Sequence, residues 1–101
     1  MVVKILPSDK GSPNGKLADA EVHFTDGVMA GMKLLGFAVW ERRQGPGRNV
    51  TFPARTYSVN GERRSFALLR PAGDNNTSQS RVRELVLQAY AEFESQAAVA
   101  S

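Results

Sequence analysis

Apolar and polar side chains alternate along residues 17–24 with a period of two. The apolar set shares one face and the polar set the other: Ala18, Ala20, Val22 and Phe24 against Asp19, Glu21 and His23. This period is that of an extended strand with one buried face and one solvent-exposed face. The pattern therefore predicts a half-buried β-strand over residues 17–24.

A long apolar segment, residues 28–40, follows the tight turn signal Asp26-Gly27. The segment is apolar on both faces, which predicts a central strand, or a strand whose second face is covered by a helix or a partner subunit. Gly31 and Gly36 interrupt it and predict bulges or close backbone approaches.

Shorter strands are predicted on both sides of this pair. Residues 2–6 form the first strand and lead into a loop over residues 8–14. Residues 49–52 and 64–69 form the last two strands, and Asn60-Gly61 between them is a strong turn signal. The first part of the chain therefore reads as an antiparallel sheet of about five strands.

The hydrophobic period changes from two to 3.6 after Pro71, which predicts one amphipathic helix over residues 77–93. Thr77 or Ser78 is the expected N-cap. The apolar helix face comprises Val82, Leu85, Val86, Ala89, Tyr90 and Phe93. We therefore expect an α+β fold in a single domain over residues 1–95, with the helix at its C-terminal end and a frayed tail over residues 96–101.

Length and composition agree with one small domain, since the chain has 101 residues, of which 42% are hydrophobic. It contains no cysteine, which excludes disulfides, cysteine metal sites and a thiol nucleophile. The apolar start is too short for a signal peptide, and no run approaches the ~18 apolar residues of a spanning helix. We expect a cytoplasmic protein with no membrane partner.

Positive charge is concentrated in the middle of the chain. Thirteen Lys and Arg against ten Asp and Glu leave a net charge of only +3. Between residues 42 and 70, however, the single acid Glu62 stands among seven arginines: Arg42, Arg43, Arg48, Arg55, Arg63, Arg64 and Arg70. Arginine forms planar, bidentate pairs with phosphate that lysine does not reproduce.

Few residues suggest catalysis. His23 is the sole histidine and lies on a predicted polar strand face beside Glu21, with no cluster of further metal ligands. Asp19 and Glu21 are two residues apart on the same face, where solvent contact is the ordinary role of such a pair. Gly45 and Gly47 precede a strand rather than a helix, unlike a phosphate-binding loop. We predict no enzyme activity, no cofactor, no metal and no small-molecule substrate.

The central arginines lie at predicted strand ends and connections, where adjacent strands bring them together on a rigid scaffold. Such a rim suits phosphate contact, and Tyr57 among them could stack on a base or pack on the sheet. Two other interpretations stay open. The same surface could meet an acidic protein partner, which would make the chain a scaffolding dimer, or it could only be a solvated face.

The order of several short motifs resembles the stage V sporulation protein G (SpoVG) family of bacterial regulators. The resemblance covers residues 2–93. It is carried by these segments: Gly15-Lys16-Leu17, the hydrophobic run 32–40, Pro53-Ala54-Arg55, Gly61-Glu62-Arg63-Arg64, Arg70-Pro71 and Val86-Leu87-Gln88-Ala89-Tyr90. The chain departs from the family at Thr56, where a second basic residue is usual, and at Ser65, where an acid is usual.

The resemblance implies a dimeric, site-preferring DNA- and RNA-binding regulator of bacterial gene expression, septation and sporulation, without catalysis or cofactor. It implies that Arg55, Arg63 and Arg64 are the basic contact residues. From charge alone we add Arg42, Arg43 and Arg48. Arg81 and Arg83, in the first turns of the helix, are expected to reach the same ligand.

Overall fold

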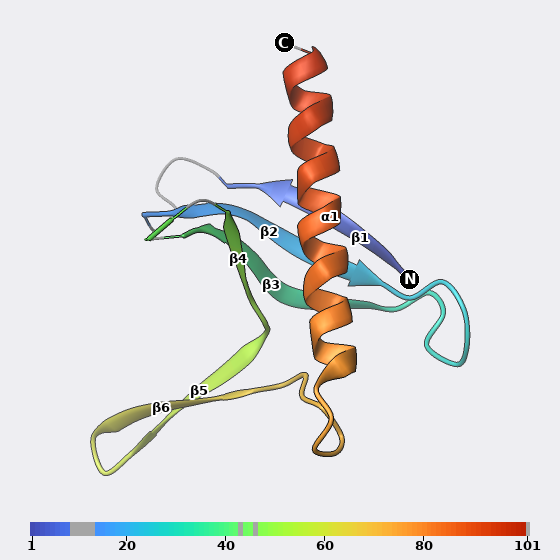
Figure 1. The fold of residues 1–101 in the computed structure, drawn as a ribbon. Coiled ribbons are helices and arrows are strands. Elements are labelled where there is room, and N and C mark those ends of the chain that lie inside the picture. The colour runs from blue at the N-terminus through green and yellow to red at the C-terminus, as the bar shows by residue number, and fades with distance from the viewer. Residues whose placement is uncertain (9–13, 43, 46, 101) are drawn as a thin grey trace.

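The protein has an α+β fold, with its strands in two antiparallel sheets and one helix following them (Figure 1). The computed structural model describes residues 1–8, 14–42, 44–45 and 47–100. Within these residues the elements are β1 (Val2–Pro7), β2 (Lys16–His23), β3 (Lys33–Glu41), β4 (Arg48–Thr51), β5 (Ala54–Val59), β6 (Glu62–Ala67) and α1 (Thr77–Ala100). The expected fold class is confirmed, with six strands in place of about five.

The larger sheet has the order β1-β2-β3-β4, and α1 packs across one of its faces (Figure 1). The alternation predicted for β2 is confirmed, because Ala18, Ala20 and Val22 are buried on the helix side. Phe37 and Val39 of β3 lie opposite Ala20 and Ala18 and complete the sheet side of the core. The core therefore lies between this sheet face and the helix.

The long strand predicted from residue 28 is wrong at its start, because β3 begins only at Lys33. Residues 24–32 form a connection closed by two backbone bonds, from the N–H of Gly31 to the carbonyl of Phe24 and from the N–H of Phe24 to the carbonyl of Met32. Gly27 and Gly31 adopt φ values of 75° and 89°, which turn the chain away from an extended path. The apolar side chain of Val28 is consequently fully exposed.

Gly36 is a bulge and a close approach, as predicted. The pairing of β2 with β3 shifts register between Ala20 and Val22, which pair with Phe37 and Leu34. Gly36 lies in the stretch between those two partners and has a φ of 107°. A Cβ at this position would lie 2.8 Å from the Cβ of Pro53, where the chain leaves β4.

The smaller sheet is a β5–β6 hairpin that projects from the body of the protein (Figure 1). Asn60 and Gly61 form its turn with φ values of 52° and 79°, as expected for the type I′ turn that such a pair favours. The sequence interpretation missed β5 and started β6 two residues late. The reason is physical: all six residues of β5 are exposed, so no buried face marks the strand.

Helix α1 extends to Ala100, beyond the predicted end at residue 93. Its cap is one step earlier than predicted, because the N–H of Ser80 donates to the carbonyl of Asn76 and the Asn75 side chain accepts a bond from the N–H of Thr77. In the described part of the chain, no helix is long and apolar enough to cross a membrane.

The predicted apolar face of α1 is confirmed in its centre and wrong at one position. Val86 and Tyr90 are buried, Val82 and Phe93 are half-buried against the core, and Ala89 is half-buried. Leu85 is 39% exposed. It lies over the edge of the sheet near Met1 and Val2, where no further strand of the described chain covers it.

Candidate nucleic-acid interface

The pairing of β5 with β6 assigns each exposed hairpin side chain to one of two faces. Residues directly opposite each other in an antiparallel pair share a face, and neighbours along a strand do not. Arg55 lies opposite Phe66, and Tyr57 lies opposite Arg64. These four residues therefore stand on the same face, which we call the aromatic–arginine face.

On the aromatic–arginine face, two rings and two guanidinium groups alternate along and across the strands. Tyr57 and Phe66 occupy one diagonal, with ring centroids 5.8 Å apart and planes inclined by 56°. Arg55 and Arg64 occupy the other diagonal. The rings remain 41% and 42% exposed, so their mutual contact leaves ring surface open to a ligand.

The opposite face of the hairpin is lined by hydroxyl groups and one arginine. Thr56 lies opposite Ser65, and Ser58 lies opposite Arg63. We call this the hydroxyl face. Arg63 and Arg64, which sequence analysis treated as one basic unit, thus point to opposite sides of the ribbon.

Arg64 has one intramolecular partner among the described residues, because its Nη2 donates to Oε2 of Glu62 at 3.0 Å. Both side chains are more than half exposed. An exposed pair of this kind contributes only about 0–1 kcal/mol to stability. A phosphate can therefore compete with Glu62 for this guanidinium at little cost.

Arg48 has a different position and is held in the helix–sheet contact. Its Nη2 donates to Oε2 of Glu94 at 2.9 Å, and its guanidinium carbon lies 5.8 Å from the centroid of the Tyr90 ring. The hydrogen bond to the Glu94 carboxylate raises the pKa of Arg48 above its ordinary value. The geometry gives Arg48 the role of fastening β4 to α1.

The other predicted arginines that the structure describes lie outside the hairpin. Arg83 packs its guanidinium 5.6 Å from the centroid of the Phe52 ring, and Arg81 is exposed on α1 beside Glu84. Arg42 is exposed at the end of β3. Arg43 lies outside the described residues. The predicted rim is therefore dispersed over the hairpin, the helix and the end of the larger sheet.

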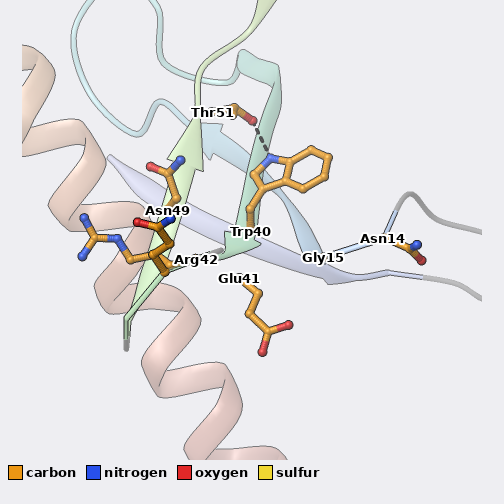
Figure 2. Close-up of a pocket in the computed structure, with 8 residues that line it drawn as sticks. Asn14, Gly15, Trp40, Glu41, Arg42, Asn49 and Thr51 are labelled. Atoms are coloured by element: carbon orange, nitrogen blue, oxygen red, sulfur yellow. Dashed lines mark hydrogen bonds between the residues drawn. The ribbon is translucent and has the colours of Figure 1, made fainter.

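A shallow pocket of about 580 Å³ lies around Trp40 (Figure 2). Trp40 donates its indole N–H to Oγ1 of Thr51 at 2.8 Å, which fixes the ring. The charged side chains of Glu41 and Arg42 extend away from the indole in different directions, as Figure 2 shows. The pocket therefore presents a fixed ring and polar edges, and these two charged groups do not converge in it.

His23 belongs to a small charged cluster on the sheet. Its Nε2 lies 3.0 Å from Oε1 of Glu21, and Nζ of Lys33 lies 3.5 Å from the same oxygen. The hydrogen bond from His23 is the main cause of a lowered pKa of Glu21; partial desolvation opposes it, and the charge of Lys33 adds to the lowering. In the part of the chain that the structure describes, no group of three or more His, Cys, Asp and Glu could hold a metal ion.

No family model, curated protein or solved structure matches this chain. The resemblance to SpoVG therefore stays a prediction from the sequence motifs, and the hairpin is the feature on which a function can be based. Of the four residues on the aromatic–arginine face, sequence analysis did not name Phe66 as a candidate binding residue. The two-residue turn at Asn60 and Gly61 was the signal that could have found it, because that turn sets the register of the pair.

Proposed function

We propose that this protein binds nucleic acid through the aromatic–arginine face of its hairpin. We further propose that it acts without catalysis as a cytoplasmic regulator of bacterial gene expression of the SpoVG type. The observation that carries the proposal is the interleaving of Arg55 and Arg64 with two exposed rings, Tyr57 and Phe66. Guanidinium groups form charge-assisted bonds with phosphate, and ring faces stack on bases.

The charge around this face supports the same function. The hairpin carries three arginines and one acid, while the rest of the chain is nearly balanced. An exposed aromatic pair on a projecting ribbon contributes little to the core, since neither ring belongs to the cluster between sheet and helix. Exposed apolar surface of this kind often marks an interaction site, and a bound ligand would cover the two rings.

We also propose that the protein forms a homodimer. Its radius of gyration is 15.2 Å, against about 13 Å for a folded chain of 100 residues. Several large apolar side chains outside the aromatic–arginine face are also exposed: Met29, Met32, Leu35 and Leu68. A dimer would cover part of this surface and present two copies of the aromatic–arginine face. Light scattering that shows only monomer would contradict it.

The test is a titration of the full chain against single-stranded DNA, duplex DNA and RNA at two salt concentrations. The variant Arg55→Gln/Arg64→Gln should weaken binding. It should also reduce the slope of log K against log salt by about 0.7–0.9 for each phosphate that the protein no longer neutralises. Arg63→Gln is the matched control, because it removes one such charge from the opposite face of the same hairpin.

Two results would overturn the proposal. If wild-type protein binds none of the three nucleic acids at low salt, the nucleic-acid function is wrong, and an acidic protein becomes the better partner. If Arg63→Gln weakens binding as much per charge as the double variant, general electrostatic attraction explains binding and the face has no special role.

A further inference from the structure

The exposed rings of the hairpin bear on the kind of nucleic acid that would be bound. Tyr57 and Phe66 come from different strands and stand on the same face, with their planes inclined by 56°. This tilted arrangement leaves part of each ring uncovered, rather than closing the two rings into a stacked pair. Uncovered ring surface is the feature on which an unpaired base can stack.

A duplex does not offer what these rings require. Its bases are already stacked on one another, and a protein reaches them only at their edges in the grooves. A two-stranded ribbon can enter the major groove, but it reads the edges there with polar side chains. On this hairpin most of those groups lie on the hydroxyl face, which carries Thr56, Ser58, Ser65 and Arg63 and no ring among its described residues. The aromatic–arginine face adds only Arg55 and Arg64 to its two rings.

The charge available on the aromatic–arginine face is also small. It consists of Arg55 and Arg64, and the latter lies beside Glu62 on the same face. Two guanidinium groups make few phosphate contacts, fewer than the roughly 6–10 at which binding to a duplex depends strongly on salt. Most of the binding at this face must therefore come from the rings.

We infer that the ligand of the aromatic–arginine face is a single-stranded nucleic acid, with one unpaired base stacked on Tyr57, another on Phe66, and their phosphates held by Arg55 and Arg64. The inference rests on the proposed function and narrows its substrate class. The two rings stand on neighbouring strands with their centroids 5.8 Å apart. Hence the face holds about two nucleotides, and a short oligonucleotide suffices for binding.

RNA and DNA single strands share this chemistry, since both present ring faces and phosphates. The 2′-hydroxyl group of RNA distinguishes them, and the stacking and phosphate contacts inferred for this face do not depend on it. The experiment therefore compares each single strand with its own duplex. Tighter binding of the single strand than of its duplex, for either RNA or DNA, supports the inference. The nucleic acid with the larger preference for its single strand is then the favoured ligand.

The test uses the full chain and oligonucleotides that carry 2-aminopurine, whose fluorescence is quenched when the base stacks. Wild-type protein should quench the single-stranded probe and bind it at least about tenfold more tightly than the duplex of the same length. Tyr57→Leu and Phe66→Leu should each weaken single-strand binding by roughly 5- to 100-fold, with an unchanged salt slope, because stacking releases no counterions.

Three comparisons keep the outcome clear. Tyr57→Phe and Phe66→Tyr retain a ring and should bind as the wild type does, even if the leucine variants fold poorly. Arg63→Gln should leave the quenching unchanged. Equal or tighter binding of the duplex, or leucine variants that fold normally and quench like the wild type, would overturn the inference while leaving nucleic-acid binding intact. Absence of binding to every probe would instead overturn the proposed function itself.

Discussion

A Cβ on Gly36 would lie 2.8 Å from the Cβ of Pro53, so β3 passes this proline only because residue 36 has no side chain. Gly36 also has a φ of 107°, which an L-residue rarely adopts. Gly36→Ala should therefore lower the free energy of unfolding by roughly 2–4 kcal/mol, through backbone strain and overpacking together. Urea denaturation measures this decrease.

Gly31→Ala is the matched control for this substitution. Gly31 has a similar φ of 89°, but nothing lies within 4 Å of the position that its Cβ would take. Its replacement should cost only the backbone strain, about 1–2 kcal/mol. Equal decreases in the two variants would show that the approach of Pro53 is not limiting.

Arg48 should matter for stability and not for binding. Arg48→Gln removes the bond to Glu94 and the contact with Tyr90, so it should lower the melting temperature slightly and leave nucleic-acid affinity unchanged. Glu94→Gln should lower the melting temperature in the same way, and the double variant should be destabilised by less than the sum of the two. A fall in affinity with an unchanged melting temperature would instead make Arg48 a contact residue.

Two neighbouring helix positions should respond very differently to truncation. Val86 is fully buried against the sheet, so Val86→Ala should cost roughly 1–3 kcal/mol. Leu85 is 39% exposed at the sheet edge, and Leu85→Ala should cost less than about 1 kcal/mol, although it removes more atoms. Urea melts of both variants check the order, and a larger effect at Leu85 would show that another surface covers it in solution.

The charged cluster on β2 predicts a dependence of stability on acid pH. Contacts with His23 and Lys33 lower the pKa of Glu21 in the folded state. The stability that ionised Glu21 contributes is therefore fully present above the pKa of Glu21 in the unfolded chain. It is lost as the pH falls through the lower pKa of Glu21 in the folded state. Glu21→Gln should remove this part of the acid-side destabilisation, and NMR titration of the Glu21 carboxyl should give a pKa below its ordinary value. An ordinary or raised value would contradict the prediction.

Periodicity alone was enough to predict the parts of the fold that face the core. The alternation of Ala18, Ala20 and Val22 and the helical spacing of Val86 and Tyr90 both arise from burial on one side, which leaves a direct trace in the sequence. The interrupted start of β3 could not be found in the same way. Residues 28–32 are as apolar as a strand, yet the chain turns there at Gly27 and Gly31.

The two faces of the hairpin were within reach of sequence reasoning, although the charge pattern alone did not separate them. Once Asn60-Gly61 is taken as a two-residue turn, Val59 must pair with Glu62, and the placement of every other hairpin side chain follows. Strand periodicity then separates Arg63 from Arg64. Strand β5 was not predicted because exposure on both of its faces produces no contrast between apolar and polar positions in the sequence.

The roles of Arg48 and Leu85 depend on where the helix crosses the sheet. Arg48 meets Glu94 across 46 positions of the chain, and no local pattern joins them. Leu85 has the spacing of a core residue, but the sheet ends beneath it at β1. Both outcomes are set by tertiary geometry, which hydrophobic spacing does not encode.

The projecting hairpin also has consequences for the energetics of binding. A two-stranded hairpin that packs mainly on itself is marginally stable in water, so we expect this hairpin to open locally while the body stays folded. Only the closed form aligns rings and guanidinium groups, and the apparent affinity is reduced by the fraction of molecules that are open. If this face binds nucleic acid as proposed, the turn at Asn60 and Gly61 affects the affinity of a site that it does not touch. Hydrogen exchange in the hairpin then measures the free energy of ordering by which that affinity is reduced.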